Sequence, residues 1–198
     1  MRIIIIALIF FSFYSCISAQ KESVINEKQF KKDIQKCIEI KVNNIPDTYF
    51  DLFDVYSMIE KTFIEEELLT DMSKDSYKNL FIEFESNKEN KDYRKKYNKI
   101  YNILQSKNDN ISWLESPSLF AAPVNCNLHI MNKYKLKDND YYSKYYSLLN
   151  QFAEEGTINN WILNNKFLMA TPEKEFSNII FRAPIISMLF GHIAFNKK

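Results

Sequence analysis

Glycine is nearly absent from this sequence, and its scarcity restricts the possible folds more than any other feature does. The 198 residues include two glycines, Gly156 and Gly191. Tight β-hairpins use glycine at positive φ, and phosphate-binding loops use it where the backbone approaches the ligand closely. Helices joined by turns that contain Asn and Asp have no such requirement. The sequence therefore predicts an all-α fold and argues against hairpin-rich sheets and nucleotide-binding loops.

Apolar side chains recur at helical spacing along most of the sequence. Tyr93, Tyr97, Ile100 and Leu104, for example, are three or four positions apart and would share one face of a helix. Several stripes of this kind, separated by polar turns, predict an irregular helical array or bundle of about six to eight helices. Residues 111–123 show no clear pattern and are open to a short strand or a single helical turn.

Capping residues indicate where several helices begin. Asn26 with Gln29 resembles a capping box, and Asp47 can cap the next helix. Thr171 precedes Pro172, which predicts a capped helix that begins at the proline.

The segment 179–195 is nearly all apolar. Pro184 lies inside this segment, so the pattern predicts a core helix that is kinked or broken. A membrane anchor is the alternative. It is disfavoured because Arg182 would be costly in a bilayer and because the segment is shorter than the roughly 20 residues that span one.

The N-terminus has the three parts of a secretory signal. Arg2 precedes a run of nine apolar residues, and small residues then lead to Ala19, which predicts cleavage after that residue. We therefore interpret residues 1–19 as a signal peptide and residues 20–198 as a single helical domain that is periplasmic or secreted. The alternatives are a lipoprotein anchored through Cys16 and a buried N-terminal helix.

Charge does not point to any class of partner. Removal of the signal takes away Arg2, so the 26 basic residues become 25 and equal the 25 acidic ones. A protein without net charge has no overall field that would draw it to nucleic acid or to an anionic membrane. We expect neither partner, and we expect no membrane span once the signal is cleaved.

Two cysteines, Cys37 and Cys126, remain in the mature sequence. In an oxidising compartment such a pair is a candidate disulfide. The bond would link positions 89 residues apart and stabilise the fold by about 4–5 kcal/mol through loop-closure entropy. Two separate buried thiols are the alternative, because free cysteine is among the most buried residue types.

Residues suited to catalysis or metal binding are few. Cys126 and His129 are close enough along a helix to form a nucleophile–base pair, and the acidic residues offer many carboxylate pairs. Neither arrangement carries a recognisable motif. A zinc site usually takes several His or Cys ligands at short spacing; His129 lies three positions after Cys126, but no further ligand motif is nearby, and His192 lies in an apolar run. We therefore assign no catalytic residue, no cofactor and no metal.

Tyrosines are concentrated in residues 141–146, which contain four of them. Tyrosine combines a large contact area with a polar tip and is common in protein interfaces. We predict Tyr142 and Tyr146 as partner-binding residues. The favoured hypothesis is an exported, non-catalytic helical protein that binds a partner protein, as an inhibitor or immunity protein does. The alternative is an exported hydrolase that uses a carboxylate pair or the pair of Cys126 and His129.

Overall fold

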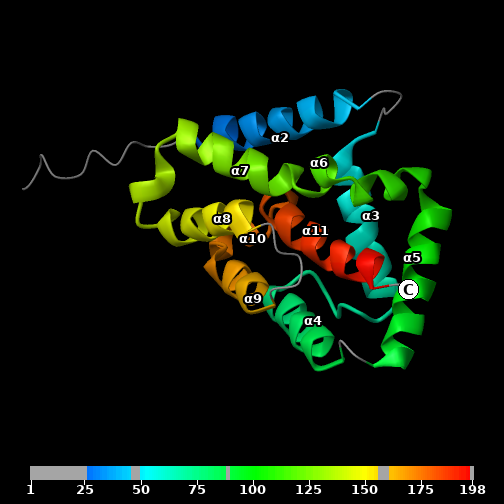
Figure 1. The fold of residues 1–198 in the computed structure, drawn as a ribbon. Coiled ribbons are helices and arrows are strands. Elements are labelled where there is room, and N and C mark those ends of the chain that lie inside the picture. Colours follow the sequence, from blue (N-terminus) through cyan, green and yellow to red (C-terminus); the bar gives the residue numbers. More distant parts are fainter. Residues whose placement is uncertain (1–25, 46–49, 88–89, 156–160, 197–198) are drawn as a thin grey trace, which may run out of the picture.

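The computed structural model describes residues 26–45, 50–87, 90–155 and 161–196, and every regular element in these ranges is a helix (Figure 1). The signal peptide predicted for residues 1–19 lies outside the described residues. The prediction of an all-α fold is confirmed for the part of the chain that the structure describes.

Eight α-helices of ten or more residues make up most of the described chain, in agreement with the number predicted. They are α2 (Glu27–Asn43), α3 (Leu52–Glu65), α4 (Lys74–Asn87), α5 (Lys91–Lys107), α7 (Ala122–Lys133), α8 (Ser143–Glu155), α9 (Trp161–Ala170) and α11 (Ile179–Phe195). Shorter helices connect them: η1 (Asp109–Glu115), α6 (Pro117–Phe120), η2 (Leu136–Asp138) and α10 (Glu173–Phe176).

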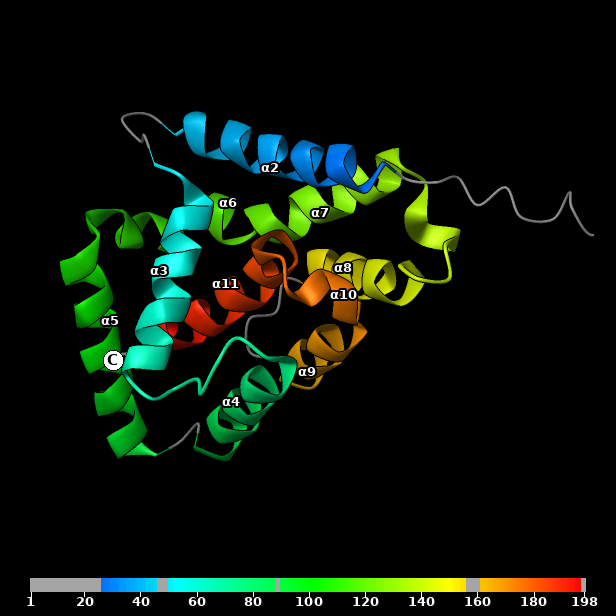
Figure 2. The same cartoon turned by 180° about the vertical axis from the view of Figure 1, so that it is seen from behind.

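Helix α11 is the centre of the fold. All of its residues from 180 to 194 are buried, and it contacts α3, α5, α7 and α9 (Figures 1 and 2). A helix that is apolar on every side must be covered on every side, and the other helices provide that cover. Among the described residues, no helix is long and apolar enough to cross a membrane.

The core helix predicted for residues 179–195 is present as α11, and Pro184 lies inside it without breaking it. The broken form of that prediction is therefore wrong. A proline has no N–H, so the hydrogen bond that residue 184 would donate to the carbonyl of Ile180 is missing. The side chain of Asn127, on α7, donates from Nδ2 to that carbonyl at 3.4 Å and to the carbonyl of Pro123 at 2.8 Å. The neighbouring helix thus replaces the bond that the proline removes.

Side-chain caps begin several helices. Asn26 accepts from the backbone N–H of Gln29 at 3.1 Å, which confirms the cap predicted at the start of α2. Asp51 caps α3 in the same way. The predicted cap Asp47 lies outside the described residues.

Two segments differ in detail from the sequence analysis. Thr171 was expected to cap a helix that begins at Pro172, but α10 begins one residue later, and the Thr171 hydroxyl donates back to the carbonyl of Phe167 at 3.1 Å. The ambiguous residues 111–123 are helical, because η1, α6 and the start of α7 follow one another there. Pro117 occupies the first turn of α6, where its missing N–H costs nothing.

Candidate functional site

The two mature cysteines form a disulfide in the structure. Cys37 of α2 and Cys126 of α7 are bonded, with 5.7 Å between their Cα atoms. Helices α2 and α7 lie side by side along one edge of the molecule in both views (Figures 1 and 2). Cys126 is completely buried, whereas Cys37 is only partly covered. The bond therefore lies just beneath the surface between the two helices.

The disulfide excludes the catalytic pair considered for Cys126 and His129, because a bonded sulfur provides no thiolate. His129 lies exposed on α7. In the described ranges, no group of three or more His, Cys, Asp and Glu side chains is arranged to hold a metal ion.

The two tyrosines predicted to bind a partner occupy different environments. Tyr146 is half-buried, and its hydroxyl donates to Oδ1 of Asn132 at 2.7 Å. Tyr142 is only 5% exposed, and its hydroxyl donates to Oε1 of Glu175 at 3.1 Å. The prediction for Tyr142 is corrected accordingly, since a buried carboxylate holds its ring inside the fold. Tyr141, its neighbour, is 48% exposed.

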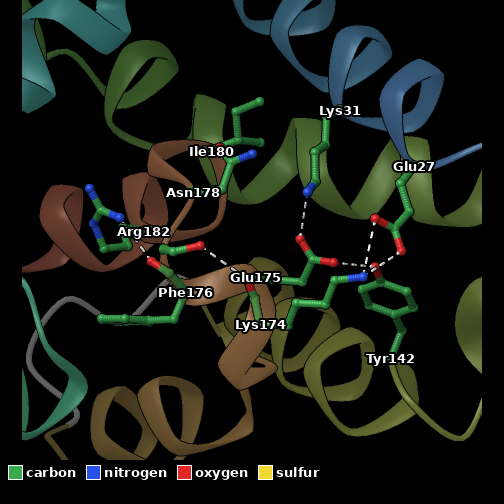
Figure 3. A network of polar contacts seen from close by, with 10 residues as sticks. Glu27, Lys31, Tyr142, Lys174, Glu175, Phe176, Asn178, Ile180 and Arg182 are labelled. Carbon is green, nitrogen blue, oxygen red and sulfur yellow. Dashed lines mark hydrogen bonds and ion pairs between the residues drawn. The ribbon is translucent and has the colours of Figure 1, made fainter.

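Glu175 is the centre of a polar cluster, the Glu175 cluster, which we define as Glu175 of α10, Tyr142 and Lys31 of α2 (Figure 3). The Glu175 side chain is completely buried, and Nζ of Lys31 lies 3.0 Å from its Oε2 atom. Burial raises the pKa of Tyr142 well above its ordinary value, and the charge of Glu175 raises it further. Lys31 keeps 26% of its side chain exposed, so the cluster reaches the surface.

A second buried carboxylate, Glu60 of α3, forms the Glu60 cluster with Tyr77 of α4 and Arg182 of α11. Arg182 donates from Nε to Oε1 of Glu60 at 2.6 Å and from Nη2 to Oε2 at 3.0 Å. Its Nη1 atom donates to the carbonyl of Phe176 at 2.8 Å (Figure 3). The hydroxyl of Tyr77 donates to Oε1 of Glu60. Burial, followed by the charge of Glu60, raises the pKa of Tyr77.

Neither cluster lines either of two surface depressions found in the structure. The first, which we call the apolar hollow, has a volume of about 280 Å³ and lies between α6, α7, α8 and the end of α11. Its apolar wall is formed by Pro117, Phe120, Val124, Phe152, Ala153 and Phe195. One charged residue, Glu115, is among its lining residues and accepts a hydrogen bond from Tyr101.

Phe195 is the most exposed aromatic ring of this hollow. It is 49% exposed, whereas Phe120 and Phe152 are buried below it. The rings of Phe120 and Phe195 touch edge to face, with 6.2 Å between their centroids. The hollow is thus an apolar recess beside an aromatic ring that is open to solvent.

The second depression, which we call the lysine groove, runs between α2 and α7 over the disulfide. It has a volume of about 310 Å³ and is lined by Lys36, Cys37, Ile40 and Lys41 from α2 and by His129, Ile130 and Lys133 from α7, together with Asp33. The two depressions hold one carboxylate each, Glu115 and Asp33, so neither brings together the carboxylate pair that a hydrolase of the predicted kind would use.

The sequence matches no family model and no curated protein, and the fold matches no solved structure.

Proposed function

We propose that this chain is an exported, non-catalytic helical protein that binds a partner protein, in the manner of an inhibitor or an immunity protein. The observation that carries the proposal is the apolar hollow beside the exposed ring of Phe195. Apolar recesses with an aromatic rim are typical of the centres of protein interfaces, where one side chain of the partner fills a pocket.

The size of the hollow favours a side chain over a free ligand. Its volume of about 280 Å³ is just below the lower end of small-molecule pockets, which is roughly 300 Å³. The side chains that line it offer few polar groups to orient a small molecule, since Glu115 and Asn125 are the polar side chains in its lining. We therefore propose that a large apolar side chain of the partner occupies it.

Export is the second part of the proposal. Structural disulfides form and persist in oxidising compartments, and the bond between Cys37 and Cys126 fits such a location. The signal predicted for residues 1–19 supports the same conclusion. N-terminal sequencing of the protein recovered outside the cytoplasm should begin at Gln20 or within a few residues of it, and an intact Met1 on that material would contradict export.

The binding proposal is tested by filling the hollow. Ala153 is exposed on α8 and lines the hollow, so Ala153→Trp should close it while leaving the core intact. Ser147→Trp, at an exposed site on the same helix outside the hollow, is the matched control. Partners captured from the envelope or medium of the source organism would be purified and titrated against all three proteins by calorimetry.

We expect Ala153→Trp to weaken binding at least about 30-fold, as expected when an anchor side chain at an interface centre is lost, and Ser147→Trp to change it less than about 2-fold. A partner that binds the wild type and Ala153→Trp equally would show that the hollow is not the docking site.

A further inference from the structure

We infer that the lysine groove is a second interaction surface, which binds an acidic, leucine-containing segment of a polypeptide. This inference goes beyond the proposed function, because it does not require the apolar hollow to be occupied. It depends on the spacing of the lining residues, on their charge, and on the disulfide beneath them.

The groove is continuous because its residues repeat at helical spacing on two facing helices. On α2, Cys37 is four positions from Asp33 and from Lys41 and three from Ile40, and on α7 His129 and Lys133 are four apart. From residue 33 to residue 41 the helix rises by about 12 Å, at about 1.5 Å per residue. A short peptide, extended or helical, fits this length.

The charge of the groove is positive although the predicted mature chain is neutral. Its one acidic residue, Asp33, is already neutralised: Lys133 pairs with it at 2.5 Å, and the Tyr134 hydroxyl donates to it at 3.2 Å. These contacts, led by the hydrogen bond from Lys133, lower the pKa of Asp33. Lys36 and Lys41 are both exposed and add their charge to the same depression. The complementary ligand is acidic.

An aliphatic surface lies among these charges. Ile40 is 50% exposed, and Ile130, which lines the same groove, is buried. A leucine between glutamates would cover Ile40, whereas a phosphate backbone carries no apolar group for that position. The depression is an open groove between two helices, a shape that suits a narrow polypeptide segment. These features favour a polypeptide over nucleic acid.

The disulfide fixes the two walls of the groove. Cys37 lies in its floor and is bonded to Cys126 of α7, so the spacing of α2 and α7 is set before a ligand arrives. A preformed site loses less conformational entropy on binding than a flexible one does. The same bond that stabilises the fold therefore also prepares this surface.

The test uses a fluorescein-labelled peptide of about ten residues that repeats two glutamates and one leucine, with fluorescence anisotropy as the readout. The variant Lys36→Glu/Lys41→Glu reverses two exposed charges of the groove. Lys137→Glu/Lys144→Glu makes the same change in net charge at exposed sites outside it and serves as the matched control.

We expect the wild type to bind the peptide, the groove variant to bind it at least about 10-fold more weakly, and the control variant to differ by less than about 3-fold. Ala153→Trp should bind the peptide as the wild type does, so failure of the apolar hollow and failure of the lysine groove remain distinguishable.

Three results would overturn the inference. One is no peptide binding by the wild type, and another is equal weakening in the groove variant and the control. The third is that labelled single-stranded DNA, or vesicles of phosphatidylglycerol and phosphatidylcholine, bind more tightly than the peptide with the same dependence on Lys36 and Lys41.

Discussion

The Glu60 cluster and the Glu175 cluster are built from the same kinds of group in two different places. Each contains a buried glutamate, a tyrosine that donates to it, and a basic side chain paired with it. In the Glu60 cluster the cation is an arginine from the central helix, with 8% of its side chain exposed. In the Glu175 cluster it is a lysine from an outer helix, with 26% exposed.

This difference in exposure indicates that the cost of removing the cation from a buried carboxylate depends on whether water can replace that cation. Arg182 meets both oxygens of Glu60 and also binds a backbone carbonyl, so its removal leaves a charge that water cannot reach. Lys31 meets one oxygen of Glu175 from the surface, where water can take its place. We therefore interpret the first cluster as a clamp of the core and the second as a weaker tie between α2 and α10.

The largest expected effect is at Arg182. Arg182→Met should lower the free energy of unfolding by about 3–5 kcal/mol, because it leaves the Glu60 charge buried without its cation. Urea denaturation measures the loss. The double variant Glu60→Met/Arg182→Met removes the isolated charge and should recover part of the stability. A loss below about 1 kcal/mol in the single variant would contradict the interpretation as a core clamp.

Outside the two clusters, His192 is another buried ionisable group, and its burial favours the neutral form of the imidazole. The ring is 3% exposed and stacks on Phe84 with 4.6 Å between centroids, and burial lowers its pKa to about 4. The unfolded chain, with a histidine pKa of about 6.5, binds the proton more readily. The contribution of the neutral imidazole to the free energy of unfolding is therefore fully present above pH ~6.5. It is lost as the pH falls toward ~4, and the total loss is about 3 kcal/mol.

The measurement is the urea midpoint between pH 7.5 and pH 4.5. Acidic side chains also titrate in this interval, so the comparison is between variants. His192→Phe should flatten the decline, whereas His129→Asn, which replaces the exposed histidine, should leave it unchanged. Equal slopes in all three proteins would show that His192 is not the group responsible.

Lys31 should have a smaller effect than Arg182. Lys31→Met should lower the free energy of unfolding by about 2 kcal/mol, since Glu175 keeps its hydrogen bond from Tyr142 and the opening left by Lys31 admits water. Urea denaturation at low and high salt provides the measurement. Lys174→Met, which removes an exposed pair with Glu27, should change stability less. A loss of unfolding free energy as large as that of Arg182→Met would show that the two clusters depend equally on their cations.

The smallest effect is expected at Tyr142. Tyr142→Phe removes one hydrogen bond to Glu175 and keeps the ring, so about 1 kcal/mol should be lost. Thermal unfolding is sufficient to detect it. Tyr77→Phe is the matched change in the Glu60 cluster and should cost more, because the Arg182 side chain beside Glu60 is 8% exposed whereas the Lys31 side chain beside Glu175 is 26% exposed. A larger loss of stability in Tyr142→Phe than in Tyr77→Phe would mean that the Glu175 cluster is the less hydrated of the two.

The local features of the fold were predictable from sequence, because they depend on neighbouring residues. Helical spacing and the lack of glycine predicted the all-α fold, and Asn26 was recognisable as a cap. The error at Tyr142 has a local cause as well. Tyr141 and Tyr142 lie in a turn, and α8 begins at Ser143, so helical spacing does not determine which of the two rings is buried.

The contacts between distant segments were not predictable. Arg182 interrupts an apolar segment and so signals a buried charge, but Glu60 lies 122 positions away and nothing near it marks it as the partner. The bond between Cys37 and Cys126 was one of two alternatives, because sequence alone cannot show that α2 lies against α7. The apolar hollow likewise requires α6, α8 and the end of α11 to meet.

Because Asn127 donates to the carbonyl of Ile180, the order in which residues 127 and 184 can change during evolution is restricted. While residue 184 is proline, loss of Asn127 leaves a buried carbonyl without a donor and is strongly selected against. If residue 184 changes first to a residue with an N–H, the helix supplies its own bond and Asn127 becomes free to vary. Homologues should therefore show a proline at 184 only together with a donor at 127, an epistatic pair separated by 57 positions.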